Sequence, residues 1–394
     1  MRSRRSTTRR RSRLAWLAFA IGALAPAGAQ ARAFQVGCNE AELRSAVQEA
    51  GFNGEEDVIW LPRACLYGLS GILLAYPDDG APLTIEGNGS TISGQSQRTA
   101  LLVNTGATVF LNDLTITQGR AGSSASGNGG AIYNAGTLTL KQVTVSDSVA
   151  TFGGGIYNAP NASLTLLLST VSGNVALDDG GGIHNKEGRL TLIDSTVSGN
   201  AALEYDGFGA GIYNDDRGTS ARAVATLAKC TITNNASRFG AGIANDEGRI
   251  TVSHCTISHN TATDGGSGAG IYHRNYTGGA FFRLGHSIVS DSVGTAHECM
   301  RDPSAPENKI TPTGENLVED GSCQINAWSG DPKLGALTGK PAVRPLLPGS
   351  PVVDLLKPAH TANCTGFDQR GSPRPKDGNG DGIAVCDLGA VEAP

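Results

Sequence analysis

The sequence predicts an all-β protein folded as a parallel β-helix, in which short strands stack coil upon coil. Three observations lead to this prediction. A Gly-(Gly/Ala)-(Gly/Ala)-Ile-x-(Asn/His) motif recurs six times, each copy is followed by an apolar run of period two, and a short strand with a polar end comes next. The copies span 129–134, 153–158, 180–185, 209–214, 240–245 and 268–273. Coils of about 24–31 residues with three strands each leave no room for the helices of βαβ units.

Composition excludes two other classes of protein. With 54 glycines, 17% charged and only 5% aromatic residues among 394, the chain is unlike an ordinary two-domain enzyme. Its 39% hydrophobic residues are enough to bury a core, so wholesale disorder is excluded as well. A repetitive, strand-rich protein is left.

The motif predicts one interior ladder and one corner of each coil. In a parallel solenoid each strand pairs with its copy in the next coil at about 4.8 Å, so equivalent residues stack. The isoleucine then points inward, and the asparagine stabilises a sharp bend, because its amide bonds to turn backbone and to the next amide. This structural ladder comprises Asn104, Asn134, Asn158, Asn185, Asn214 and Asn245, separated by 30, 24, 27, 29 and 31 residues. Its first member belongs to a degenerate copy at 100–104.

Both ends of the solenoid are predicted to be covered. Residues 40–50 are amphipathic and follow Asn39, a suitable N-cap, so they predict a capping helix ahead of a first strand at 57–62. The N-terminal cap is therefore placed at 34–70, the repeats at 71–295 and an irregular C-terminal cap or anchor-type region at 296–394.

Residues 1–33 read as a secretory signal peptide, with arginines before an apolar run and small residues around 29–33. Removing 1–31 takes away seven arginines and no acid, so Lys+Arg falls from 31 to 24 against 36 Asp+Glu, a net charge of −12. That charge disfavours nucleic acid and anionic membranes as partners. No stretch of the mature chain is long enough to span a bilayer.

Eight cysteines in an exported chain favour disulfides over a metal cluster, since no two have Cys-x-x-Cys spacing. The simplest pairing is sequential: Cys38 with Cys65, Cys230 with Cys255, Cys299 with Cys323, and Cys364 with Cys386. Cys230 and Cys255 occupy the slot that Ser169 and Ser195 hold in earlier coils. We expect them to form a covalent staple between adjacent coils, with stacked free thiols as the alternative.

The repeat phrases Gly-Gly-Gly-Ile-Tyr-Asn, Leu-Thr-Leu and Ser-Thr-Val-Ser-Gly-Asn resemble those of secreted bacterial right-handed parallel β-helix proteins of the pectin-lyase-like superfamily. The phrases at 346–354, 368–375 and 386–392 resemble the choice-of-anchor Q group. This resemblance covers nearly the whole mature chain, from Cys38 to Glu392. It implies right-handed coils and a place outside the cell or on its surface.

The primary functional hypothesis is a non-enzymatic interaction or adhesion scaffold whose partner is a polysaccharide or another cell-surface component. The alternative that the resemblance implies is a polysaccharide lyase or glycoside hydrolase acting on an acidic polysaccharide. Such an enzyme needs a basic residue beside clustered carboxylates, or a carboxylate pair, in one groove. Candidate residues are Asp178, Asp179, His184, Glu204, Asp206, Asp215, Asp216 and Arg217. None matches a known catalytic phrase, so no catalytic residue is assigned.

Two further sets of residues are candidate binding sites. The position between Ile and Asn points outward, and its side chains are interpreted as an aromatic cover of the sheet, with a candidate glycan-stacking face as the alternative. That face comprises Tyr133, Tyr157, His184, Tyr213 and Tyr272. Asp377, Asn379 and Asp381, with Gly382, have the spacing that opens an EF-hand-type loop and predict a weak calcium site. Because the closing Glu is missing, an ordinary Gly/Asp turn is the alternative.

Overall fold

The computed structural model describes residues 32–122, 127–218, 222–294, 297–302, 304, 309–356 and 364–393. The predicted signal peptide lies outside these residues up to position 31, and positions 32 and 33 begin the first strand. Among the described residues, no helix has the length and apolar character needed to cross a membrane.

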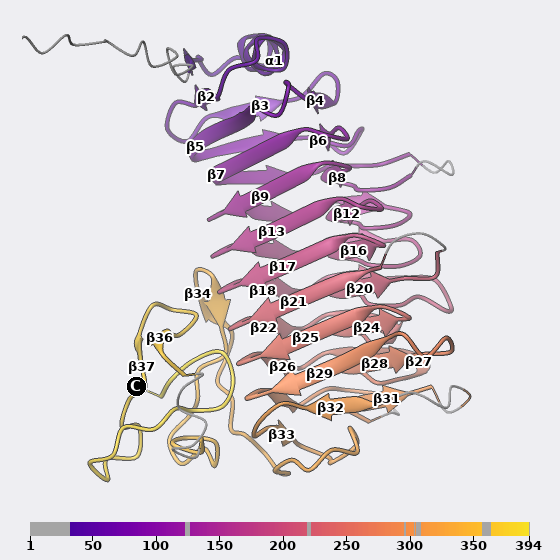
Figure 1. Ribbon diagram of the computed structural model, residues 1–394, viewed down its shortest axis with the longest axis vertical. Helices are drawn as coiled ribbons and strands as arrows, with labels where there is room; N and C mark the ends of the chain where they lie inside the picture. Colours follow the sequence, from indigo (N-terminus) through magenta and orange to yellow (C-terminus); the bar gives the residue numbers. More distant parts are fainter. Residues whose placement is uncertain are drawn as a thin grey trace, which may run out of the picture. The chain divides into compact units, whose positions relative to one another are not determined.

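From Arg32 onward the chain winds into a right-handed parallel β-helix with three long ladders of strands, here called faces 1, 2 and 3 (Figure 1). Face 1 contains β1 (Arg32–Gln35), β2 (Asp57–Trp60), β5 (Pro82–Ser93), β7 (Thr108–Thr117), β9 (Thr137–Lys141), β13 (Ser163–Leu167), β17 (Arg189–Ile193), β21 (Val224–Ala228), β25 (Arg249–Ser253), β29 (Phe281–Gly285) and β32 (Ile310–Pro312).

Face 2 follows face 1 in every coil and face 3 closes the coil. Face 2 contains β3 (Leu66–Gly68), the second halves of β5 and β7, β10 (Thr144–Ser146), β14 (Thr170–Ser172), β18 (Thr196–Ser198), β22 (Thr231–Thr233), β26 (Thr256–Ser258), β30 (Ile288–Ser290) and β33 (Leu317–Val318). Face 3 contains β4 (Leu73–Ala75), β6 (Leu101–Val103), β8 (Ile132–Asn134), β12 (Ile156–Asn158), β16 (Ile183–Lys186), β20 (Ile212–Asp215), β24 (Ile243–Asp246), β28 (Ile271–Arg274) and β31 (Cys299–Arg301).

Alternation within each short strand explains why these residues fold this way. In Thr144–Ser146 the central Val145 is buried while its two hydroxyl neighbours are half-buried and face outward. The motif isoleucines pair in register from Ile132 to Ile271 and are fully buried, so the core is a stack of equivalent aliphatic side chains. The fold class predicted from the repeats is therefore confirmed.

The solenoid is longer than the repeat alone predicts. Its first coil already includes β2, β3 and β4, and a last coil continues to Val318, where β31, β32 and β33 pair with β28, β29 and β30. A fourth, shorter ladder joins faces 2 and 3 in the middle coils. It contains β11 (Val149–Ala150), β15 (Val175–Ala176), β19 (Ala201–Ala202), β23 (Ala236–Phe239) and β27 (Thr261–Ser267). Strands β11, β15 and β19 have two residues each, too few to show an alternating pattern in the sequence.

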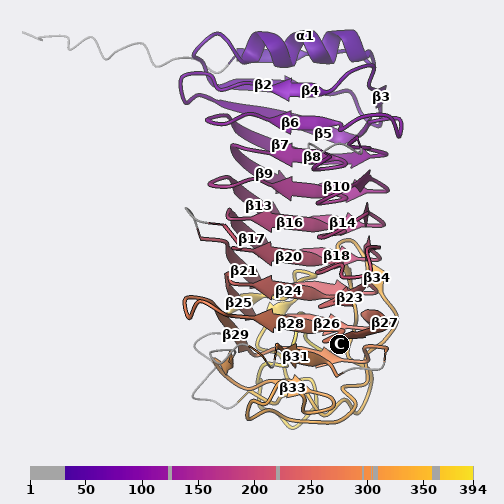
Figure 2. The same ribbon diagram turned by 90° about the vertical axis from the view of Figure 1, so that its right-hand side faces the viewer.

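Helix α1 (Glu40–Ala50) covers the first coil, where the amphipathic pattern predicts it (Figure 2). The side chain of Asn39 accepts a hydrogen bond from the backbone N–H of Ala41 at 2.8 Å, which caps the helix. Leu43 and Val47 are buried on the face that packs on the coil.

The asparagines at the end of the face 3 strands form a continuous amide ladder. Each side-chain Nδ2 donates to Oδ1 of the next coil at 2.6–2.7 Å, from Asn134 through Asn245. At the lower end, Nδ2 of Asn245 lies 3.1 Å from Nδ1 of His273. Asn104 is outside the ladder, which corrects the prediction: Val103 pairs with Asn134, and the amide of Asn104 donates to the Ala75 carbonyl at 3.0 Å. Inward alternation of the β6 strand puts Val103, fully buried, in that register.

A second amide ladder was not predicted. It lies at the end of face 2, where Nδ2 donates to Oδ1 of the next coil at 2.9–3.0 Å among Asn174, Asn200, Asn235 and Asn260. The signal was present in the Ser-Gly-Asn and equivalent phrases that end these strands.

Three of the expected disulfides are present, Cys38–Cys65, Cys299–Cys323 and Cys364–Cys386. The expected staple between Cys230 and Cys255 is wrong, because both are buried free thiols. Side chains in this slot turn toward the backbone of the adjacent coil rather than toward each other. Sγ of Cys255 accepts from the Cys230 N–H at 3.3 Å, as Oγ of Ser195 accepts from the Ser169 N–H at 3.1 Å.

After the last coil the chain returns along face 2 of the lower coils as a C-terminal segment, residues 329–356 and 364–393 (Figure 1). It contains two short hairpins, β34 (Thr338–Gly339) with β35 (Ala342–Val343), and β36 (Gly366–Phe367) with β37 (Pro373–Arg374). A small core made by Leu346, Val352 and Leu388 against Ile288 and Leu317 anchors the segment on the solenoid.

Candidate functional site

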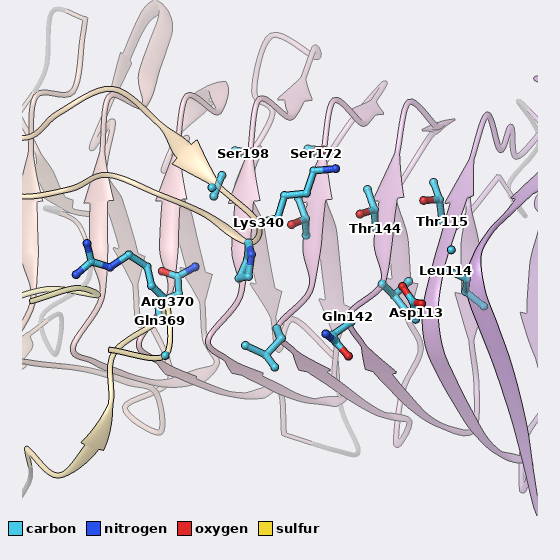
Figure 3. A pocket seen from close by; sticks show the side chains of 18 residues that line it. Asp113, Leu114, Thr115, Gln142, Thr144, Ser172, Ser198, Lys340, Gln369 and Arg370 are labelled. Carbon is cyan, nitrogen blue, oxygen red and sulfur yellow. The ribbon is translucent and has the colours of Figure 1, made fainter. Parts of the chain in front are cut away.

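A groove of about 920 Å³ lies between face 2 and the C-terminal segment (Figure 3). One wall is the corner between faces 1 and 2, and the other is the tip of the β34–β35 hairpin. The lining residues are Gly89, Asp113, Leu114, Thr115, Gln142, Val143, Thr144, Leu168, Thr170, Ser172, Ser198, Gly339, Lys340, Pro341, Ala342, Gln369, Arg370 and Gly371.

The groove floor consists of two hydroxyl rows that run along the solenoid axis. Strands β10, β14, β18, β22 and β26 of face 2 read hydroxyl-aliphatic-hydroxyl, so their first and third residues point outward and stack on their copies in adjacent coils. The threonine row comprises Thr91, Thr115, Thr144, Thr170, Thr196, Thr231 and Thr256. The serine row comprises Ser93, Thr117, Ser146, Ser172, Ser198, Thr233 and Ser258. The repeat pattern predicts these strands but not the groove, because the opposite wall of the groove is distant in sequence.

The C-terminal segment covers the lower part of both rows through specific hydrogen bonds. Oγ1 of Thr196 donates to the Ala342 carbonyl at 2.6 Å and accepts from the Gln369 amide at 2.9 Å. Oγ1 of Thr231 donates to Oε1 of Gln369 at 2.6 Å, and the Arg344 guanidinium donates to Thr233 at 2.8 Å. The upper hydroxyls of the groove therefore remain open while the lower ones are already paired.

Lys340 provides the positive charge of the groove. It is exposed at the hairpin tip, extends over the groove, and makes no ion pair with any residue that the structure describes (Figure 3). The Arg370 guanidinium instead pairs with Asp368, 2.7 Å away, so its charge is largely used within the segment. Asp113, at the upper end of the groove, is exposed.

A separate cluster of charges lies on the outer side of face 3 and includes several of the candidate catalytic residues. Nε of Arg217 lies 3.3 Å from Oδ1 of Asp215 and 3.0 Å from Oδ2 of Asp246, and its Nη2 lies 3.5 Å from Oδ2 of Asp179. Nε2 of His184 lies 3.4 Å from Oδ2 of Asp215. The structure thus brings Asp179, His184, Asp215 and Arg217 together.

Burial and pairing perturb these groups in opposite directions. Burial raises the pKa of Asp179 to about 8, which Arg217 only partly offsets. Burial acts in the same direction on Asp215, but bonding to His184 and the charges of Arg217 and Lys186 outweigh it and lower the pKa of Asp215. Burial lowers the pKa of His184 and keeps its imidazole neutral. Asp179 is therefore the protonated member of the cluster at neutral pH.

Access to this cluster is limited. Asp179, His184 and Asp215 are all buried, whereas Arg217 is half-exposed and forms the outer surface. Among the remaining candidates, Asp178 and Asp216 are half-buried, and Oδ2 of Asp216 lies 4.0 Å from Nη1 of Arg222. Glu204 and Asp206 are exposed. The cluster is therefore a buried network of ion pairs in which only the arginine reaches the surface.

Burial favours the aromatic cover of the sheet over the candidate glycan-stacking face. Tyr157, His184, Tyr213 and Tyr272 are only 9%, 3%, 0% and 7% exposed, and only Tyr133 is partly open. Rings from the preceding loops cover the column, since the centroid of Phe208 lies 5.8 Å from that of Tyr213. The aromatic residues therefore cover the sheet, and they present no platform to a glycan.

The predicted calcium loop is a tight turn near the end of the chain. Asp377 accepts from the N–H groups of Gly380 and Gly382 at 2.7 and 2.9 Å, and Asp381 accepts from Ile383 at 2.8 Å. Asp387 accepts from the Asp354 backbone instead of closing the loop. Calcium binding stays a prediction, which rests on the spacing of Asp377, Asn379 and Asp381 in the sequence.

No protein-family model matches the sequence, and no curated protein matches it either. Among solved structures, the crystal structure of pectate lyase Pel9A is similar, with a TM-score of 0.51 and 13% sequence identity. The match covers 93% of this chain and 98% of that chain. The chain thus has a pectate-lyase-like parallel β-helix fold, and at this identity the similarity concerns the fold alone.

Proposed function

We propose that this protein is an extracellular β-helix protein that binds an acidic polysaccharide in the groove beside the C-terminal segment. The observation that carries the proposal is the pair of open hydroxyl rows beneath the unpaired charge of Lys340. Export through the N-terminal leader, and membership of the choice-of-anchor Q group, belong to the same proposal. The three disulfides support an oxidising compartment.

The chemistry of the groove suits an extended sugar chain. Hydroxyl and amide side chains such as Thr144, Ser172 and Gln142 both donate and accept hydrogen bonds, as sugar hydroxyls require. A uronate carboxylate adds a partner for the Lys340 ammonium. The similar structure is that of a pectate lyase, and pectate is an acidic polymer, which supports a polyuronide as the ligand.

The direct test is calorimetric titration with polygalacturonate and with a neutral polysaccharide. Thr144→Trp fills the groove floor and should abolish binding, whereas Thr139→Trp, on face 1 of the same coil, should leave it intact. Lys340→Gln should weaken binding by about 1.4- to fivefold, since an exposed ion pair contributes roughly 0.2–1 kcal/mol. The exposed Lys309→Gln is its control. Unchanged binding by Thr144→Trp would exclude the groove.

A second candidate function is cleavage of the polysaccharide by a lyase or glycosidase. The observation that favours it is the concentration of Asp179, Asp215 and Arg217, because an enzyme needs carboxylates beside a basic residue. Incubation with a panel of polyuronides, followed by assays for unsaturated products and new reducing ends, tests it. Activity that Asp179→Asn removes would favour the enzyme, and binding without products would favour the scaffold.

A further inference from the structure

The hydroxyl rows of face 2 are continuous, but only their upper part is open. Thr115, Thr144 and Thr170 are half-buried and line the groove, whereas Thr196 and Thr231 are fully buried. In the threonine row the boundary falls between strands β14 and β18, where the hairpin reaches the floor at Thr196, while Ser198 of β18 still lines the groove. The groove therefore ends before the two hydroxyl rows do, because the rows continue beneath the C-terminal segment.

Specific hydrogen bonds from the C-terminal segment close the lower end of the groove. Both the donor and the acceptor capacity of Thr196 are used, by the Ala342 carbonyl and the Gln369 amide. Gln369 also donates to the Ser195 carbonyl at 3.1 Å and accepts from Thr231. Because these contacts tie the segment to two successive coils, a ligand cannot pass beneath it without breaking them.

The opposite end of the groove is open. A Cβ built at Gly89 meets no atom within 4 Å, so space lies beyond this lining residue. Asp113 is exposed at the same end. Along the threonine row, the groove is therefore closed at the Thr196 coil and open toward Gly89.

We infer that the groove receives the end of a polysaccharide chain, with the terminal sugar against the Thr196 coil. This inference rests on the proposed function and adds the part of the polymer that is recognised. Successive coils are about 4.8 Å apart, comparable with the length of one sugar residue, so each coil offers one set of hydroxyls per sugar. An internal stretch of polymer would have to continue through Ala342 and Gln369, which the closing hydrogen bonds prevent.

The test is titration of the full chain with polygalacturonate fractions of increasing length at equal total uronate. If chain ends bind, the affinity per chain is constant, and the apparent affinity per uronate falls in proportion to chain length. Coupling a bulky fluorophore to one end of a short oligogalacturonide should abolish binding, whereas coupling it to the other end should have little effect. This second experiment identifies which end of the sugar chain enters the groove.

The outcomes separate the inference from the proposal on which it depends. A constant affinity per uronate, or equal binding of oligomers blocked at either end, overturns recognition of chain ends but leaves polysaccharide binding standing. No binding of any fraction overturns both. Thr144→Trp serves as the control, because it should remove the length-dependent binding if that binding occurs in the groove.

Discussion

Replacing Asn185 with alanine should strongly destabilise the middle of the solenoid. The Asn185 amide is fully buried; it donates to Asn214 at 2.7 Å and to the Gly188 carbonyl at 3.0 Å, and it accepts from Asn158 at 2.7 Å. Each lost bond contributes about 0.5–1.5 kcal/mol, and each buried group left unpaired costs about 1–3 kcal/mol. Because Asn158 keeps other acceptors, including the Arg189 carbonyl, the expected loss is roughly 3–5 kcal/mol.

Equilibrium urea denaturation, followed by circular dichroism and by fluorescence, measures this change. Asn104→Ala is the matched control, since its half-buried amide makes one bond, to the Ala75 carbonyl, and should cost about 1 kcal/mol or less. Coincident transitions from the two probes are needed before the midpoints are converted into free energies. Equal, small losses for Asn185→Ala and Asn104→Ala would refute the argument that the stacked amides stabilise the coils.

Three other predictions follow from single side chains. Cys230→Ser and Cys255→Ser should each change the unfolding free energy by less than about 1 kcal/mol, because serine fills this slot in other coils; a loss near 3 kcal/mol would instead indicate a disulfide. The stability advantage of Asp179→Asn over the wild type should grow between about pH 4 and pH 8 and then level off, because the folded protein keeps the Asp179 proton up to a pKa of about 8 while the unfolded chain releases it near 4. Urea midpoints across that range measure the difference in stability between the two proteins. A difference that does not change with pH would contradict the raised pKa of the buried carboxyl. Calorimetry with millimolar calcium should show heat for the wild type and none for Asp381→Ala, and flat traces for both would remove the site.

The sequence was sufficient for features that repeat from coil to coil. The interior isoleucines and the asparagines from Asn134 onward could be placed because a parallel solenoid repeats each side chain at a fixed register. The prediction for Asn104 was wrong because a degenerate motif does not fix the register of its strand. In the structure, Val103 and not Asn104 pairs with Asn134. Local pattern therefore predicts a coil well only where the motif is intact.

Contacts between distant segments were beyond sequence reasoning. Alternation predicts that Tyr213 points outward, but whether an outward residue meets solvent depends on the loops that return over it, such as the one that carries Phe208. In the same way, Thr196 contacts Gln369, which lies 173 positions further along the chain, and no periodicity signals that contact. The groove and the burial of the tyrosines therefore emerge only from the folded chain.

The C-terminal segment also changes how the solenoid should come apart. In a bare solenoid each coil touches only its neighbours, so coils fray one at a time from an end. Here the C-terminal segment makes hydrogen bonds to Thr196, Thr231 and Thr256 in successive coils, so these coils must open as a single cooperative block. Hydrogen exchange should accordingly be slow and uniform from β18 to β26 and graded through the coils above. Because residues 342, 369 and 390 follow these coils in the chain, the lower block reaches its full resistance to unfolding only after the C-terminal segment has been synthesised.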